Sequence, residues 1–149
     1  MNKEIIYKGK WVYNWFSNME PLDNPFTYKG VTYNTVENFY QSMKLPDTRL
    51  DLRAEIAAMS PHKAKTEIRN KSKYPWRDTW DQAFSLVIME YGLRIKFAPG
   101  TSWYTKLKET EGEIVEWNNW GDRVWGKTLD GVGENHLGKI LMKIRDGAD

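Results

Sequence analysis

A chain of 149 residues is long enough for one hydrophobic core and short for two, so a single domain is expected over residues 1–149. Its 40% hydrophobic and 28% charged content is typical of a soluble globular protein, and no apolar run reaches the roughly 18 residues of a membrane span. The lack of cysteine excludes disulfides and thiolate metal sites, and two histidines are too few for a His-rich zinc site. The sequence therefore predicts a cytoplasmic protein without a membrane segment, a metal or a cofactor.

The net charge of +2 indicates no particular partner, but the aromatic and basic residues are unevenly placed. Three of the eight Trp residues, Trp117, Trp120 and Trp125, lie close together in the second half of the chain. Because a core uses Trp sparingly, some of these rings are expected to stack on a flat ligand. The stretch 63–77 carries basic residues against Glu67 alone. This basic run either binds phosphate or forms a solvated helix face.

Hydrophobic periodicity and turn residues predict a mixed fold with more helix than strand. In chain order, the expected elements are a strand at 4–7, a loop over 11–18, a β-hairpin with strands at 26–28 and 31–33, helices at 35–44, 51–59, 61–70, 80–97 and 103–110, a strand at 113–117, and a helix from 135 or 136 to 145. Lys29-Gly30 supplies a two-residue hairpin turn, and Pro46 stops the first helix. The expected fold class is α+β, mainly α-helical, with the hairpin and a few small strands.

The helix at 80–97 is expected to be the central core helix. Its Gly92 permits a close contact with a neighbouring helix. Apolar residues recur along it with helical spacing, at Trp80, Phe84, Val87, Ile88, Tyr91 and Ile95. The last helix is expected to bury Leu137, Ile140, Leu141 and Ile144.

The first helix carries an unusual polar face. Helical spacing places Glu37, Tyr40, Gln41 and Lys44 on one side of it. A carboxylate, a phenol, an amide and an amine so close together indicate a site that handles a sugar–base bond. Two structural interpretations stay open beside that one. With Asn34 as N-cap, Glu37 holds the acidic position of a capping box, and Lys44 is a favourable cation at the helix C-terminus.

A second group of chemically active side chains lies in a predicted loop from Glu116 to Gly126. Bulky neighbours such as Trp125 could partly desolvate Asp122 and raise the pKa of its carboxyl toward the range of a general acid. The alternative is an Asx turn beside a packing Trp. A helix that begins near Asn135 could also offer its N-terminus to a phosphate, although the sequence there lacks the Ser or Thr of a nucleotide-hydrolysing loop.

Taken together, these segments resemble the NADAR (YbiA-like) family in order and over nearly the whole chain. The matching positions are Phe16-Ser17-Asn18, Thr35-Val36-Glu37, Tyr40, Gln41, Lys44, Arg94, Lys96-Phe97, Glu116, Asp122, Trp125-Gly126, Gly133, Asn135, Leu137-Gly138, Leu141-Met142 and Arg145. Two departures are present. Asn38 stands where the family commonly has His, and the additional Trp117 and Trp120 before Asp122 indicate a distinct substrate.

The resemblance implies a compact, mostly helical fold and an N-glycosidase that hydrolyses a bond between ribose C1′ and a nitrogen of a flat ring. Family substrates are ADP-ribosylated guanine, including that base in nucleic acid, and phosphoribosylated intermediates of riboflavin synthesis. The candidate catalytic residues are Lys44, Glu37, Asp122 and Glu116. The candidate substrate contacts are Ser17, Asn18, Tyr40, Gln41, Trp80, Trp120, Trp125 and Asn135, with aromatic rings to stack the base and amides to read its edges.

Two mechanisms fit these residues. In one, Lys44 attacks C1′ and forms a Schiff base with the ring-opened sugar. In the other, Asp122 or Glu116 assists departure of the base nitrogen while Glu37 orients water toward C1′. The competing function is a module that binds ADP-ribose, a nucleotide or single-stranded nucleic acid without chemistry. The carboxylates argue against that module because they repel phosphate.

Overall fold

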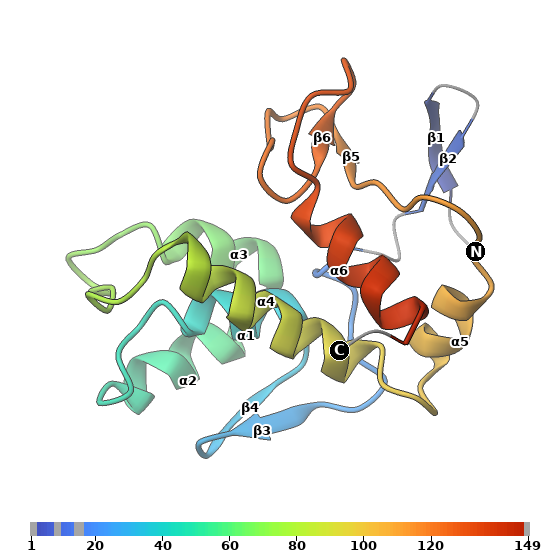
Figure 1. Ribbon diagram of the computed structural model, residues 1–149. Helices are drawn as coiled ribbons and strands as arrows, with labels where there is room; N and C mark the ends of the chain where they lie inside the picture. Colours follow the sequence, from blue (N-terminus) through green and yellow to red (C-terminus); the bar gives the residue numbers. More distant parts are fainter. Residues whose placement is uncertain (1–2, 8–9, 14–16, 148–149) are drawn as a thin grey trace. The chain divides into compact units, whose positions relative to one another are not determined.

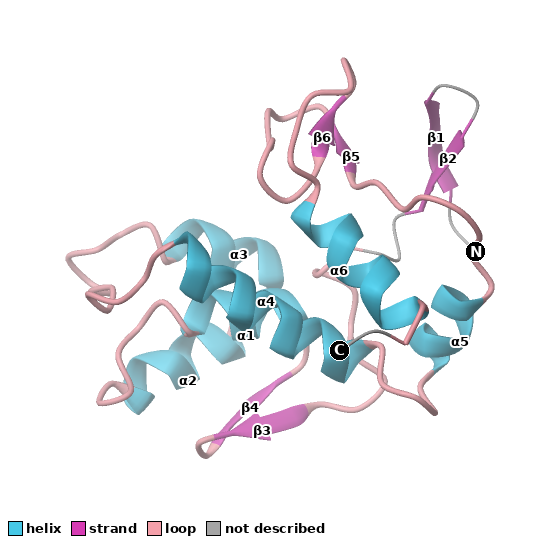
Figure 2. Ribbon diagram, viewed as in Figure 1, coloured by secondary structure: helices cyan, strands magenta, loops and turns pink. Residues whose placement is uncertain are grey.

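The computed structural model describes residues 3–7, 10–13 and 17–147, and the chain divides into two compact units (Figure 1). The central unit comprises Asn18–Lys96, and the terminal unit comprises Met1–Ser17 together with Phe97–Asp149. The described residues form six helices and six short strands, which confirms the predicted α+β, mainly α-helical class (Figure 2). No helix among them is both long and apolar enough to cross a membrane. The single domain over residues 1–149 stays a prediction.

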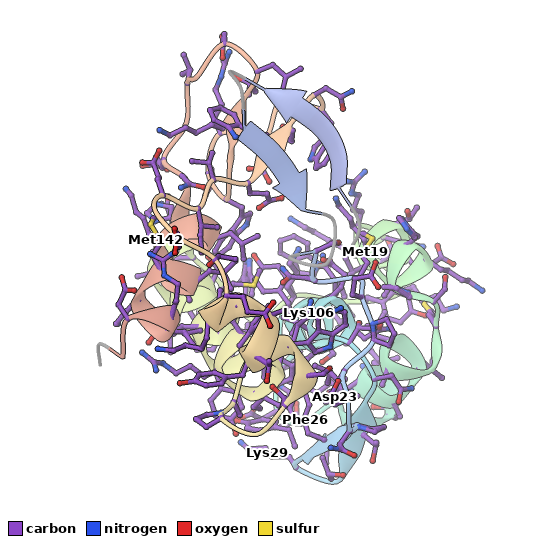
Figure 3. All side chains as sticks on the ribbon, turned by 90° about the vertical axis from the view of Figure 1, so that its right-hand side faces the viewer. Met19, Asp23, Phe26, Lys29, Lys106 and Met142 are labelled. Atoms are coloured by element: carbon purple, nitrogen blue, oxygen red, sulfur yellow. The ribbon has the colours of Figure 1, made fainter. Side chains whose placement is uncertain are left out.

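The central unit consists of a β-hairpin and four helices. The elements are β3 (Phe26–Tyr28), β4 (Val31–Tyr33), α1 (Val36–Ser42), α2 (Leu50–Ala58), α3 (Pro61–Glu67) and α4 (Gln82–Lys96). The hairpin pairs as predicted, with Phe26 opposite Tyr33 and a two-residue turn at Lys29-Gly30. Both turn residues have positive φ, 49° and 83°, as the favoured two-residue hairpin turn requires. Figure 3 labels Phe26, where the hairpin begins, and Lys29 in its turn.

Helix α1 is the element on which the rest of the central unit packs. It contacts α2, α3, α4 and β4, and all seven of its residues are buried. Its Phe39 ring lies 5.1 Å from the ring of Phe26, 5.4 Å from that of Tyr33 and 5.6 Å from that of Tyr91. Because neighbours cover every side of α1, its polar residues are enclosed in the protein and not turned to water.

The beginning of α1 differs from the prediction by one residue. The N-cap is Thr35, whose Oγ1 accepts a hydrogen bond from the backbone N–H of Asn38 at 3.0 Å. Glu37 therefore lies one position too early for the capping box, and its carboxylate accepts instead from the side chain of Gln41. The predicted cap at Asn34 and the capping interpretation of Glu37 are both wrong.

The predicted buried face of α4 is also wrong in part. Val87 is 66% exposed and Tyr91 48% exposed, whereas the buried residues of α4 are Ser85, Met89, Gly92, Leu93 and Lys96. The close contact at Gly92 is present. A Cβ atom there would lie 3.0 Å from Val36 Cγ1 and 3.3 Å from Phe39 Cδ2. The helix turns its small residue toward α1, which leaves part of its apolar stripe in solvent.

The terminal unit contains three two-element pairs. These are the antiparallel strands β1 (Lys3–Tyr7) and β2 (Lys10–Tyr13), the helices α5 (Ser102–Lys108) and α6 (His136–Arg145), and the parallel strands β5 (Trp117–Asn118) and β6 (Lys127–Thr128). Strand β2 replaces part of the loop predicted over 11–18. Helix α6 buries Leu137, Ile140, Leu141 and Ile144, as predicted.

The predicted strand at 113–117 is reduced to its last residue by an interaction with the start of α6. The Asn135 side chain donates from Nδ2 to the carbonyl of Ile114 at 2.9 Å and accepts from the N–H of Glu116 at 3.0 Å. A Cβ atom at Gly138 would collide with the Ile114 carbonyl oxygen. Residues 114–116 thus pair with the Asn135 side chain instead of a strand, and their close approach to α6 requires glycine at position 138.

Replacing Gly92 with Leu should lower the free energy of unfolding by about 1–3 kcal/mol, because the new side chain must displace α1. Val87→Leu on the same helix serves as the matched control, since Val87 is exposed. Urea unfolding of the two variants gives both values. Equal stability of Gly92→Leu and Val87→Leu would contradict the close contact between α1 and α4.

Candidate active site

The candidate active site of the central unit is centred on Lys44. This residue follows the C-cap of α1, Met43, and so lies in a turn just beyond the helix in which it was predicted. Its Nζ lies 4.6 Å from the ring centre of Trp76, 5.3 Å from that of Tyr40 and 5.7 Å from that of Trp80. The amine is therefore surrounded by aromatic surface on three rings.

Hydrogen bonds and ion pairs between separate segments hold this arrangement together. The N–H of Arg77 donates to the carbonyl of Lys44 at 2.7 Å, which fixes the 74–80 connector against the turn after α1. The indole N–H of Trp76 donates to the carbonyl of Ile68 at 2.8 Å and sets the ring's orientation. The Asp47 carboxylate adds ion pairs with Arg53 at 2.7 Å and with Arg77 at 3.7 Å.

The surroundings of Lys44 change its protonation. Burial lowers the pKa of its amine to about 8, because the charged form loses hydration. The Glu37 carboxylate opposes this shift, while the positive charges of Arg69, Lys65 and Lys71 add to it. An amine with a pKa near 8 has a substantial neutral fraction at physiological pH, and a neutral amine is a nucleophile.

Glu37 is enclosed beside this amine. It is 8% exposed, its backbone N–H donates to the carbonyl of Asn18 at 3.0 Å, and its Oε2 accepts from Gln41 Nε2. Burial raises the pKa of its carboxyl, against the lowering effect of the Gln41 hydrogen bond and of the charges of Lys65, Lys44 and His62. The carboxyl can therefore hold a proton at a higher pH than an ordinary glutamate does.

The basic run at 63–77 belongs to the same neighbourhood. Lys65, Arg69 and Lys71 act on Lys44 electrostatically, and Lys71 Nζ lies 4.2 Å from the ring centre of Trp76. Trp76 thus contacts both Lys44 and a residue of the basic run. Several cations beside a desolvated amine are arranged to attract an anionic group of a ligand.

The predicted substrate contacts Asn18 and Gln41 both adjoin Glu37. Asn18 donates from Nδ2 to Met89 Sδ at 3.2 Å. The other amide atom of each side chain, Asn18 Oδ1 and Gln41 Oε1, is buried and has no hydrogen-bond partner within the described part of the chain. Six of the predicted residues, Asn18, Glu37, Tyr40, Gln41, Lys44 and Trp80, thus gather in the central unit.

The remaining candidates lie in the terminal unit. Asp122 Oδ1 accepts from the N–H groups of Val124 at 3.0 Å and Trp125 at 2.9 Å, which is the Asx-turn alternative. Its own N–H donates to the buried side chain of Asn118 at 2.9 Å. The Asp122 carboxyl thus organises the loop, and a catalytic role for it stays a prediction.

The other terminal-unit candidates differ in exposure. Trp120 is 64% exposed, Ser17 is exposed, and Trp125 is half-buried with its ring 6.4 Å from that of His136. Asn135 is buried, and its side chain is hydrogen-bonded to the backbone of Ile114 and Glu116. These contacts give Asn135 a structural role, and substrate contacts by this group stay predictions.

One residue of the site was missed from the sequence. No role was predicted for Trp76 from the sequence, yet its ring is the one of the three nearest to Lys44 Nζ. The excess of Trp was the available signal. Among the described residues, no group of His, Cys, Asp or Glu could hold a metal ion.

The pKa of Lys44 offers a direct test of this geometry. Glu37→Gln should lower it below 8, because the charge that opposes the shift is removed, and Lys71→Gln should raise it. NMR titration of protein labelled with ¹³C at lysine Cε measures both changes. Lys139→Gln, an exposed substitution in α6, should leave the titration unchanged. A wild-type Lys44 pKa near 10.5 would contradict the desolvated site.

The comparisons with known proteins agree with the described fold. The NADAR domain model matches residues 6–147, so it spans segments of both units. N-glycosidase YbiA of Shigella flexneri serotype 5b is 33% identical over 135 residues, which is 90% of this chain and 81% of that protein. An N-glycosidase of Nostoc punctiforme is 30% identical over 95% of this chain and 89% of its own length.

A riboflavin biosynthesis protein of Vibrio vulnificus is 31% identical over 80% of this chain, but the match spans only 32% of that protein. Among solved structures, the NMR structure of the E. coli protein YbiA matches with a TM-score of 0.71 and 30% identity, over 89% of this chain and 76% of that one. Sequence and structure thus agree over most of the chain, which belongs to the NADAR domain family.

Proposed function

We propose that this protein is an N-glycosidase that hydrolyses the bond between C1′ of a phosphorylated ribose and a nitrogen of a flat base. The observation that carries the proposal is the desolvated amine of Lys44 beside the buried carboxyl of Glu37. The names of the Shigella and Nostoc relatives, matched over more than four-fifths of their length, support the same reaction class.

The lowered pKa makes Lys44 an effective nucleophile. With a pKa of about 8, roughly one lysine in ten is neutral at pH 7, against about one in three thousand at an ordinary pKa of 10.5. The neutral amine attacks C1′, and the bonding electrons of the C1′–N bond pass to the base nitrogen. Protonated Glu37 gives its proton to that nitrogen, and the base departs neutral.

The covalent intermediate is then released by water. The C1′–O4′ bond opens as the attached Nζ passes a proton to O4′, which leaves a Schiff base between Lys44 and the open-chain sugar. Water adds to C1′ and gives its proton to the Glu37 carboxylate. The C1′–Nζ bond then breaks as the new hydroxyl proton moves to nitrogen. Free sugar, the Lys44 amine and protonated Glu37 result, so all atoms and charges balance.

The cations near Lys44 support a substrate that carries phosphate. Lys65, Arg69 and Lys71 lie close enough to affect the Lys44 amine. A phosphate bound among them would hold the sugar beside the nucleophile, and the Trp76 and Trp80 rings offer aromatic surface to a planar base. Two substrates meet this description, a phosphoribosylaminopyrimidine and ADP-ribosylated guanine, and the name of the Vibrio relative supports the first.

Base release from these two substrates, followed by chromatography, tests the proposal. Lys44→Ala should lower the rate by a factor of about 10³ or more, because the covalent step is lost, and Glu37→Gln by about 10²–10⁴, because the proton donor is lost. Lys139→Ala, an exposed substitution on α6 outside the basic run, is the matched control and should keep wild-type activity.

Each of the other outcomes has a distinct meaning. Activity that survives Lys44→Ala but not Glu37→Gln would contradict the Schiff base and favour water attack assisted by carboxylates. Binding of both substrates without base release, unchanged in Glu37→Gln, would contradict the enzyme and favour a binding module.

A further inference from the structure

Two buried acceptor atoms of the central unit are left without a donor. Gln41 is 4% exposed, and its Oε1 is buried without a hydrogen-bond partner among the described residues. Asn18 Oδ1 is in the same state. Native proteins pair nearly all such atoms, so two in one neighbourhood indicate groups reserved for a ligand. The ligand must supply hydrogen-bond donors.

Both residues are hydrogen-bonded to Glu37, but in different ways. The Gln41 side chain donates to Glu37 Oε2 from one turn further along α1, and the backbone carbonyl of Asn18 accepts from the backbone N–H of Glu37 at 3.0 Å. In the proposed function, on which this inference rests, Glu37 protonates the base nitrogen bonded to C1′. Because both residues adjoin Glu37, in the proposed function they lie near the ribose as well as near the base.

The chemistry of the two amides separates ribose from base. An amide that reads a base edge typically uses its NH₂ and its carbonyl together, since base edges alternate donors and acceptors. Here the nitrogen of Gln41 is engaged by Glu37 and that of Asn18 by Met89. The buried amide atoms that lack a partner are the two acceptors, and the 2′- and 3′-hydroxyls of ribose are a matching pair of donors.

We propose that Gln41 Oε1 and Asn18 Oδ1 accept hydrogen bonds from the 2′- and 3′-hydroxyls of the substrate's ribose, so that the site selects ribosides over deoxyribosides. Acceptors at the hydroxyl next to the reacting carbon also aid the chemistry. A hydrogen bond to that hydroxyl strengthens as positive charge develops at C1′ in glycosidase transition states. Gln41 thus links recognition of the sugar to the carboxyl that protonates the leaving base.

Binding of closed-ring sugars tests the proposal without a chemical step. The probes are methyl β-D-ribofuranoside 5-phosphate and its 2-deoxy and 3-deoxy forms, which cannot form a Schiff base because the methyl glycoside keeps the ring closed. Calorimetric titration of the wild type should show about a tenfold loss of affinity for each missing hydroxyl, the size expected for one net hydrogen bond. In Gln41→Met and in Asn18→Leu, the loss should shrink to about twofold for one of the two hydroxyls.

Several results would overturn the proposal. Equal affinity of the wild type for all three sugars would do so whether or not the variants fold, as would failure of the wild type to bind the parent sugar. Melting temperatures show whether the two variants are folded. If both are folded and each still loses about tenfold in affinity for each missing hydroxyl, the two amides contact the base, or neither the base nor the ribose. Base release by the same wild-type preparation separates these failures from failure of the glycosidase itself, because it needs no variant and no analogue.

Discussion

The desolvation of a single amine is the constraint on which the rest of the central unit depends. Lys44 is surrounded by the rings of Tyr40, Trp76 and Trp80, and this burial is the largest influence on its pKa. Even a half-buried lysine such as Lys44 is costly to a protein in its charged form. The structure maintains the arrangement through packed rings and backbone hydrogen bonds from distant segments, which is the kind of support that a preorganised nucleophile requires.

The fold around α1 provides that support. Phe39 and Val36 pack against α4 at Gly92, so the apolar side of the helix is fully used and the polar side is turned toward Lys44 and the basic run. The Asn38 side chain donates from Nδ2 to the carbonyls of Ile56 and Met59 at 2.9 and 2.8 Å. These hydrogen bonds join α1 to the end of α2.

Features governed by neighbouring residues could be predicted from the sequence, and features governed by distant contacts could not. The hairpin at Lys29-Gly30 and the buried stripe of α6 follow from local turn chemistry and periodicity. The buried face of α4 could be predicted only in part. The close contact at Gly92 was expected, but the exposure of Val87 and Tyr91 depends on how α4 packs against α1. Thr35 and Asn34 are both good N-caps, and only the hydrogen bond to Asn38 decides between them.

The site shows the same division. The polar face of α1 was predictable from helical spacing, and its role as a site was suggested by its unusual composition. The position of Trp76 beside Lys44 was not predictable, because it depends on the Arg77–Lys44 backbone hydrogen bond and on the bond from the Trp76 indole to Ile68.

Whether Lys44 is the nucleophile is tested most directly by borohydride reduction during turnover, followed by peptide mass spectrometry. A stable sugar adduct on Lys44, absent in Lys44→Arg, is the predicted result. Full turnover with no adduct on any lysine would contradict it.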